Sequence, residues 1–156
     1  MKAYFGRRYT LSASHRLHAD ALTPEQNRAA YGKCNNPHGH GHNYVVEVVV
    51  GGPVARNTGM VINLVDLDAV VRTQVLDRFD HTNLNLDPLF TSTVPTTENL
   101  CRAVFRLLKE NLPTFESEVA AGDFPSALNL EYVRVEETEN NFFQCFDSGE
   151  HSATGS

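Results

Sequence analysis

The sequence predicts an α+β domain in which helices cover one face of an antiparallel sheet. Two segments with strand-like patterns come first, two segments with helical spacing of apolar residues follow, and two further strand-like segments come last. This order suits an antiparallel sheet with its helices packed on one face. A length of 156 residues suits one domain, so we expect a single domain over residues 1–147 and a disordered tail over residues 148–156.

The first two strands have the clearest patterns. Residues 4–15 alternate with a period of two, and residues 42–51 are rich in valine before a Gly-Gly-Pro sequence ends them. Alternation places on one face of the first strand the side chains of Tyr9, Leu11, Ala13 and His15. Residues 60–64 are predicted as the hairpin partner of the second strand. Residues 18–37 are predicted as a long polar loop, and such loops are more often functional than idle.

Two helices are predicted in the middle of the chain. The first spans residues 65–79, and its apolar stripe consists of Leu67, Val70, Val71 and Val75. The second begins after Pro95, where a threonine is the expected N-cap, and Pro113 ends it. Its buried face consists of Leu100, Val104, Leu107 and Leu108. A third strand is predicted over residues 128–137, with its hairpin partner over residues 141–146.

Composition and charge exclude several classes of function. A net charge of −6 argues against a nucleic-acid partner, and no apolar run approaches the ~20 residues that cross a bilayer. The first residues lack the apolar core of a signal peptide, so a cytoplasmic protein is expected. Three cysteines at irregular spacing argue against a disulfide framework. Residues 1–33 carry an excess of lysine and arginine, which suits either an anionic small substrate or an ordinary solvated surface.

Histidines near the start of the second strand predict a zinc site. His38, His40 and His42 are two residues apart, and side chains at this spacing point to the same side of an extended chain. Neutral imidazole is a favoured zinc ligand, and a catalytic site takes three protein ligands. We predict His40 and His42 as a pair, with His15 from the first strand as the third ligand. Spacing alone also allows the pair His38 and His40, and His18 in place of His15.

Three further residues or pairs suggest acid–base or binding chemistry. Cys34 lies just before the histidines and beside a lysine, where a nearby cation would activate the thiol; otherwise it is an inert small residue. Asp80 and His81 form a possible acid–base pair, although the aspartate would equally serve as a turn cap. Glu137 is in phase with the apolar residues of the third strand, where a ligand with two N–H donors would satisfy its carboxylate. It would otherwise turn into solvent at the end of the strand.

Four motifs in order resemble the 6-pyruvoyltetrahydropterin synthase family, which includes the 6-carboxytetrahydropterin synthases of queuosine biosynthesis. They are SASHRL at residues 12–17, GKCNNPHGHGHNY at residues 32–44, DHTNL at residues 80–84 and EETENN at residues 136–141. The resemblance implies a tunnelling fold, in which a four-stranded antiparallel sheet carries two helices and monomers associate into a barrel. It also implies a homo-oligomer, a trimer or a dimer of trimers, with active sites between subunits.

The resemblance also implies roles for individual residues. It implies that zinc is bound by His15, His40 and His42. The catalytic set comprises Cys34, Asp80 and His81, and Glu137 anchors the pterin ring. The residues implied to line the pterin pocket are Thr96, Thr97 and Glu98.

The implied activity is that of a zinc-dependent lyase of tetrahydrobiopterin biosynthesis. The substrate would be 7,8-dihydroneopterin triphosphate, converted to 6-pyruvoyltetrahydropterin with loss of triphosphate and without a redox cofactor. Two alternatives stand beside it. One is 6-carboxytetrahydropterin synthase, which also releases acetaldehyde. Many members of that branch have three residues between the thiol and the first histidine, a spacing that Cys34 and His38 satisfy here, whereas five residues separate Cys34 from His40, as in the pyruvoyl-forming branch. The other is a non-catalytic protein that binds zinc or pterin.

Overall fold

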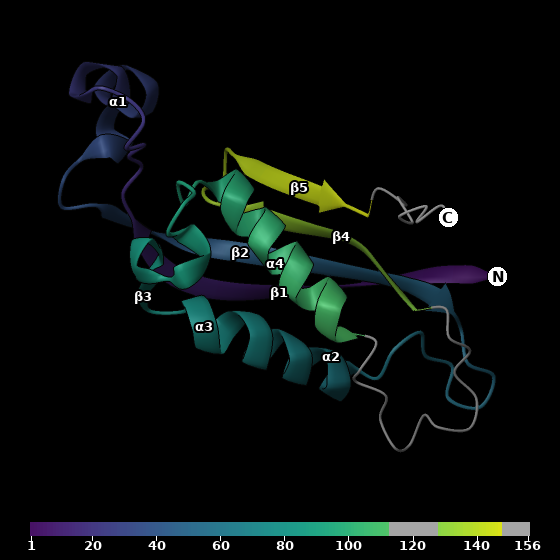
Figure 1. Ribbon diagram of the computed structural model, residues 1–156. Coiled ribbons are helices and arrows are strands. Elements are labelled where there is room, and N and C mark those ends of the chain that lie inside the picture. Colours follow the sequence, from purple (N-terminus) through teal and green to yellow (C-terminus); the bar gives the residue numbers. More distant parts are fainter. Residues whose placement is uncertain (113–127, 148–156) are drawn as a thin grey trace, which may run out of the picture.

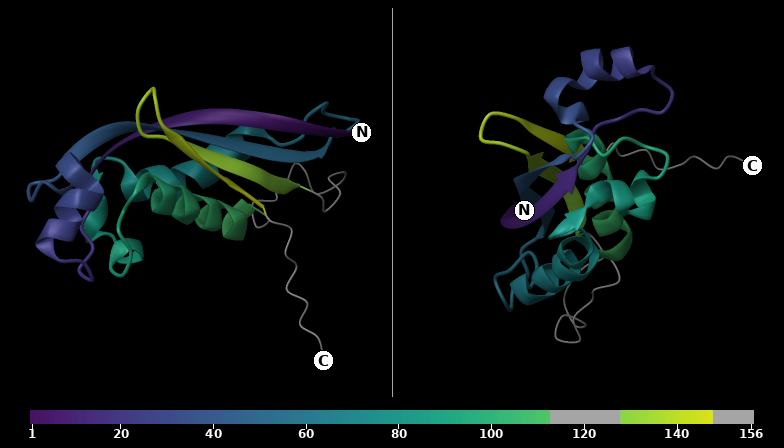
Figure 2. Two further views of the ribbon diagram at one scale, coloured as in Figure 1. Left: turned by 90° about the horizontal axis from the view of Figure 1, so that it is seen from above. Right: turned by 90° about the vertical axis from the view of Figure 1, so that its left-hand side faces the viewer.

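The computed structural model describes residues 1–112 and 128–147, which form a two-layer α+β structure of one long sheet and helices packed on one of its faces (Figures 1 and 2). Along the chain, the elements are β1 (Lys2–His15), α1 (Pro24–Tyr31), β2 (His40–Pro53), α2 (Leu64–Val71), α3 (Asp77–Phe79), β3 (Thr82–Asn83), α4 (Thr97–Asn111), β4 (Asn129–Glu136) and β5 (Phe142–Phe146). The sheet has the order β3-β1-β2-β4-β5. The predicted fold class is therefore confirmed.

Four long strands form the predicted antiparallel sheet. β1 and β2 pair along their full lengths, β2 pairs with β4, and β4 pairs with β5. The fifth strand, β3, is a correction to the four-stranded prediction. It has only two residues and pairs in parallel with Ala13 and Ser14 of β1. A segment this short has no periodicity from which the sequence would reveal it.

The helices cover one face of the sheet. The chain is helical without interruption from Leu64 to Phe79, because a π-helical turn (Arg72–Leu76) joins α2 to α3. α4 lies beside this run and packs on β4 and β5 (Figure 1). The shared core contains side chains from both layers, among them Leu11, Val46, Val48, Val70, Phe79, Val104 and Val133. Both predicted helices are confirmed, and Thr96 is the N-cap of α4.

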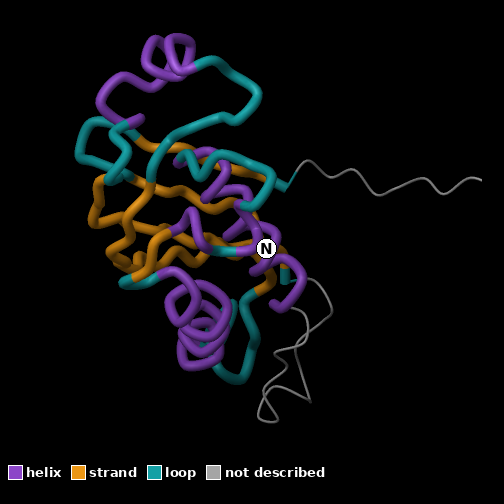
Figure 3. The backbone as a smooth tube through the Cα atoms, turned by 60° about the vertical axis from the view of Figure 1, so that its left-hand side comes forward, coloured by secondary structure: helices purple, strands orange, loops and turns teal. Residues whose placement is uncertain are grey.

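Two sequence predictions about segments outside the long strands and the two main helices are wrong. Residues 60–64 do not form a strand; Asn63 is the N-cap of α2, and its side chain accepts a hydrogen bond from the Val65 amide. The predicted loop over residues 18–37 contains α1, which begins with a capping box formed by Thr23 and Gln26. This helix buries only Asn27, so it has no apolar stripe for a periodicity argument to detect. It projects beyond the end of the sheet, apart from the helices that cover the sheet (Figure 3).

The described residues contain no helix long and apolar enough to span a membrane. The predicted effect of Pro113 on the second helix and the predicted disorder of residues 148–156 fall outside the described residues.

Candidate metal centre and active site

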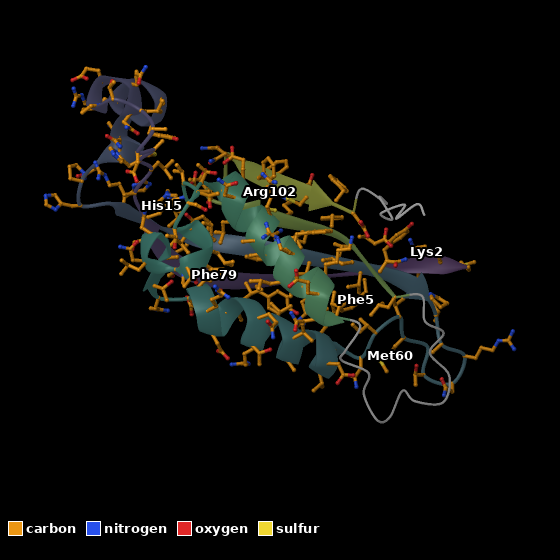
Figure 4. The ribbon with its side chains drawn as sticks, in the orientation of Figure 1. Lys2, Phe5, His15, Met60, Phe79 and Arg102 are labelled. Atoms are coloured by element: carbon orange, nitrogen blue, oxygen red, sulfur yellow. The ribbon has the colours of Figure 1, made fainter. Side chains whose placement is uncertain are left out.

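Three histidines meet where β1 ends and β2 begins. His15 pairs directly with His40 across the two strands, and His42 is two residues further along β2 on the same face. One ring nitrogen from each lies within 4.8 Å of the others, and the Nε2 atoms of His15 and His40 are 3.0 Å apart. In Figure 4, His15 lies at the opposite end of β1 from Lys2. The structure therefore brings together the three histidines predicted as zinc ligands.

The alternative ligands lie elsewhere. His38 is exposed in the turn before β2. The Nδ1 atom of His18 lies 3.1 Å from the side-chain nitrogen of Asn35, and its Nε2 atom faces Asp20 at 3.8 Å. Among the described residues, the cluster that could hold a metal ion consists of His15, His40 and His42 alone. The first histidine of the cluster after Cys34 is therefore His40, with five residues between them, and His38 is not part of the cluster.

The environment of the cluster suits a bound cation. His15 is 1% exposed, and burial lowers its pKa and that of His42, which favours the neutral imidazole that ligates metals. Two buried nitrogens, Nδ1 of His40 and Nε2 of His42, have no hydrogen-bond partner within the described residues. Unpaired buried polar atoms are costly, and a metal ion would satisfy such a nitrogen. The donor set therefore fits a divalent metal with an open coordination position.

Glu137 lies beside the histidines. It follows the last residue of β4 and keeps the phase of the buried Val133 and Val135, so its carboxylate points toward the cluster. Its Oε1 atom is 3.7 Å from Nε2 of His15 and 3.5 Å from Nε2 of His42. The in-phase interpretation of the sequence thus describes the direction of this side chain correctly.

Glu137 is held in its ionised form. Burial by itself would raise its pKa, but hydrogen bonds from Asn141 and Thr97, with help from the nearby histidines, bring the pKa below the ordinary value. The side-chain nitrogen of Asn141 donates to Oε2 at 2.7 Å. A carboxylate fixed in this way can accept two N–H hydrogen bonds from a ligand.

The first turn of α4 also reaches the site. Thr97 is buried and donates its hydrogen bond to Glu137, so it lies within the cluster. The side-chain oxygen of Thr96 accepts from the backbone amide of Asn99, which makes Thr96 a helix cap. Glu98 is exposed in the first turn. Of the three residues implied to line a pterin pocket, Thr97 is the one in direct contact with Glu137.

Cys34 is held close to the site by a short 3₁₀ turn (Gly32–Asn35). Its carbonyl oxygen accepts from the Leu17 amide at 2.9 Å, and the side chain of Asn35 donates to the Leu17 carbonyl at 2.7 Å. These bonds fasten the turn to the chain just after His15. The Cys34 thiol is partly exposed. Burial is the main reason for the raised pKa of Tyr44, two residues beyond His42, and the charge of Glu137 adds to it.

Asp80 and His81 form the predicted pair, with 3.0 Å between Oδ1 of Asp80 and Nδ1 of His81. The Ser12 amide donates to Asp80 at 2.8 Å and is the main cause of the lowered pKa of this carboxyl, which stays ionised. His81 has a positive φ of 58°, a strained conformation that its amide stabilises by donating to the Ser12 carbonyl. The two residues are thus fixed against β1 by backbone hydrogen bonds.

This pair does not join the histidine cluster within one chain. The side chains of Ser12 and Asn43 are hydrogen-bonded to each other, and strand alternation places them on the sheet face opposite His15. His81 borders a cavity of about 450 Å³ whose lining also includes Ser12, Asn43 and His42 of the histidine cluster. Its side chain is 81% exposed. Among the described residues, no hydrogen bond or ion pair therefore links Asp80 or His81 to Cys34 or to the histidine cluster.

Most cations of the basic N-terminal segment are neutralised by carboxylates. The pairs are Lys2 with Glu131, Arg7 with Asp68, Arg8 with Glu136 and Arg28 with Glu25. Arg16 instead donates to the Asn35 carbonyl at 3.1 Å, beside Cys34. Arg16, through its contact with Asn35, and Lys33, as the residue before Cys34, lie near this turn and have no carboxylate partner among the described residues. Within residues 1–33, Arg16 and Lys33 are therefore the candidates for binding an anionic substrate.

Sequence reasoning missed three contributors to the site. They are the side chain of Asn141, the phenol of Tyr44 and the backbone carbonyl of Pro95. Asn141 and Tyr44 lie within the motifs given above, but the sequence of neither motif indicates that Asn141 contacts Glu137 or that Tyr44 contacts His15. A backbone carbonyl has no side-chain signature, so only the folded chain reveals its contact.

Comparison with known proteins identifies close relatives. The family model for 6-pyruvoyl tetrahydropterin synthase matches residues 4–147. The 6-pyruvoyl tetrahydrobiopterin synthase of Drosophila melanogaster is 50% identical over 99 residues, which cover 63% of this chain and 59% of that protein. The human protein of the same name is 41% identical over 141 residues, or 90% of this chain and 88% of that protein.

The fold agrees with a solved structure of the same kind. The structure of Caenorhabditis elegans 6-pyruvoyl tetrahydropterin synthase matches with a TM-score of 0.80 and 38% identity, over 95% of this chain and 97% of that one. The sheet and helices described above are thus those of the tunnelling fold. Sequence and fold together show that this chain belongs to the 6-pyruvoyl tetrahydropterin synthase family.

Proposed function

We propose that the protein is a zinc-dependent lyase that converts 7,8-dihydroneopterin triphosphate to 6-pyruvoyltetrahydropterin and releases triphosphate. One observation carries the proposal most directly. In a chain of this family, Glu137 and the cluster of His15, His40 and His42 share one buried face, with 3.5 to 3.7 Å between the carboxylate and two of the rings. A pterin anchor and a metal site at this spacing suit one small substrate.

Each group at the site has a distinct task. The ionised Glu137 would accept hydrogen bonds from the N–H groups of the pterin ring, with Thr97 and Asn141 fixing its orientation. Zinc, if held by the three histidines, would supply Lewis acidity at the hydroxylated side chain of the substrate. Cys34, beside the same cluster, would act as a base for a proton on that side chain. Arg16 and Lys33 would attract the triphosphate.

The Asp80–His81 pair would complete the acid–base set from a neighbouring subunit. Within one chain, the described residues show no hydrogen bond or ion pair between this pair and the histidine cluster, and His81 is exposed beside an open cavity. An imidazole oriented by a carboxylate can exchange protons with a substrate. The site would therefore be shared in a homo-oligomer, as the family resemblance implies.

The test begins with zinc-loaded protein and 7,8-dihydroneopterin triphosphate. Mass spectrometry should show 6-pyruvoyltetrahydropterin and free triphosphate. Cys34→Ala should abolish turnover while the zinc content stays at the wild-type level. Cys145→Ala serves as the matched control, because Cys145 lies on β5 among the core residues and should leave turnover unchanged.

The other outcomes would each change the assignment. A carboxylated pterin with acetaldehyde would move the enzyme to the 6-carboxytetrahydropterin branch. Full activity of Cys34→Ala would contradict the role of the thiol. Zinc binding without turnover by the wild type would leave a non-catalytic zinc protein.

A further inference from the structure

The Nδ1 atom of the His15 ring contacts two oxygen atoms from different parts of the chain. Its Nδ1 atom is 2.7 Å from the carbonyl oxygen of Pro95 and 3.3 Å from the hydroxyl oxygen of Tyr44. A carbonyl oxygen can only accept a hydrogen bond, so Nδ1 must carry the proton. The lone pair of His15 is therefore on Nε2, which faces His40 at 3.0 Å.

Tyr44 forms the floor of the metal cluster. It follows His42 by two residues on β2 and pairs with Leu11 across the strands, so it shares the face of the histidines. It is fully buried. Its ring centroid is 5.5 Å from that of His42 and 6.2 Å from that of His15, with edge-on geometry in both cases. The ring therefore restricts the tilt of two ligands at once.

The hydroxyl group of Tyr44 also contacts His15 directly, as a hydrogen-bond acceptor. Because Nδ1 of His15 donates to Pro95, the Tyr44 oxygen can serve only as a second acceptor of the same proton. The two acceptors lie on different elements, the loop before α4 and strand β2. Together they define the plane of the imidazole ring more narrowly than one acceptor would.

We propose that Tyr44 is a positioning residue of the metal site, and that its hydroxyl and the Pro95 carbonyl together present Nε2 of His15 to the metal. The inference rests on the proposed zinc site and goes beyond it, because it assigns work to a residue that would touch neither metal nor substrate. Partners of this kind fix the tautomer and orientation of a metal-bound histidine, and their loss typically weakens metal affinity by about 10- to 100-fold.

The test is the zinc affinity of Tyr44→Phe, measured by competition with a chromophoric chelator in the absence of substrate. This substitution keeps the ring and removes only the hydroxyl. The remaining Pro95 carbonyl retains part of the support, so we expect an affinity roughly 10-fold weaker than that of the wild type. The thermal midpoint of the metal-free protein should change little, whereas a purely structural role would lower that midpoint and leave the affinity intact.

Tyr9→Phe is the matched control. Tyr9 lies on the same sheet face and donates its hydroxyl proton to Asp68 at 2.8 Å, away from the histidines, so its loss should leave zinc affinity unchanged. His15→Ala is the reference for the site itself. If Tyr44→Phe binds zinc as tightly as Tyr9→Phe does, the positioning role is wrong while the zinc site stands. If His15→Ala also binds normally, the zinc site fails, and the inference fails with it.

A second measurement needs no metal. Nitrogen-15 NMR of the imidazole groups in the metal-free wild type should place the His15 proton on Nδ1. A proton on Nε2 would overturn the inference, because the lone pair would then face Pro95 and Tyr44 instead of the cluster.

Discussion

Adjacent glutamates at the end of β4 show how finely the chain separates roles at the residue scale. Glu136 points to the open face of the sheet, where Arg8 donates to it at 2.8 Å and Arg134 lies 3.1 Å away. Glu137 points to the opposite face, toward His15 and His42. The period of two in a strand accounts for this division. Glu136 therefore belongs to a network of ion pairs, whereas Glu137 faces the histidine cluster, where a ligand could bind.

Glu137→Gln should weaken substrate binding while leaving zinc in place. The variant keeps the shape of the side chain but loses the charge that strengthens its hydrogen bonds to the pterin. Hydrogen bonds to charged groups are worth about 1.5–3 kcal/mol, so KM should rise roughly 10- to 100-fold in steady-state kinetics. Zinc content is measured in the same preparations.

Glu136→Gln provides the control at the next position, since it removes an equal charge from the other face. Its KM should remain close to that of the wild type. Equal effects of the two substitutions would show that overall charge, rather than a specific pterin contact, governs substrate binding.

At the element scale, the loop with Asp80 and His81 is fixed by the elements that flank it. Arg78 of α3 makes two hydrogen bonds of 2.8 Å to Asp87, which lies between two 3₁₀ turns. Asp87 also accepts from the Leu89 amide at 2.8 Å. The fork-like pair ties the end of the helical run to the chain after β3. The clamp formed by Arg78 and Asp87 joins residues nine positions apart and brackets the loop that carries His81.

Asp87 should contribute stability that is lost in acid. The hydrogen bond from Arg78 is the main reason that its pKa is lowered in the folded state. The unfolded carboxyl takes up its proton near pH 3.9, above the folded value, so stability is fully present above that pH and falls below it. Asp87→Asn should therefore cost roughly 1–2 kcal/mol at pH 7, and its deficit should shrink as the pH drops from 5 to 3. Urea midpoints at each pH give the comparison.

Asp77→Asn tests whether the effect belongs to the clamp, since Asp77 is an exposed carboxylate on the same helical run. It should follow the wild-type midpoint at every pH. A deficit of Asp87→Asn that is the same at pH 3 and pH 7 would contradict the assigned role of the Arg78 pair.

At the scale of the whole molecule, the sheet is unequal in its two faces and open at its edges. Helices cover one face, and the described residues leave the other uncovered (Figure 2). β5 ends the sheet on one side, and β3 covers only two residues of β1 on the other. Unpaired strand edges are templates for pairing with another chain. The predicted homo-oligomer, a trimer or a dimer of trimers, would close these edges and bring Asp80 and His81 to a neighbour's histidine cluster.

Subunit complementation should reveal such a shared site. Cys34→Ala and His81→Ala should each be inactive alone, because each removes one half of the acid–base set. Co-refolding the two variants should restore turnover, since some interfaces would then combine an intact Cys34 with an intact His81. A mixture of Cys34→Ala with His40→Ala is the control and should stay inactive, because both lesions lie in the same half of the site.

Sedimentation equilibrium establishes in parallel whether the particle contains several copies of the chain. A monomer with full activity, or no recovery in a mixed oligomer, would show that the site does not span two subunits.

The site residues differ in how far the sequence predicted them. His40, His42 and Glu137 could be predicted as site residues from the sequence, because strand periodicity fixes which side chains share a face. The choice among the candidate histidines, and the contact of Thr97 with Glu137, required the folded chain. So did α1, whose polar surface leaves no periodic trace, and β3, which is too short to show one.

The fold class, the two main helices, the four long strands and the side chains able to form the site could all be predicted from the amino-acid sequence. Local patterns suffice for these features because backbone periodicity and capping act over a few residues. The pairing of His15 with His40, the support of His15 by Pro95 and Tyr44, and the attachment of His81 to Ser12 emerged only from the folded chain. These depend on strand register and on contacts between residues far apart in the chain, which no local pattern encodes.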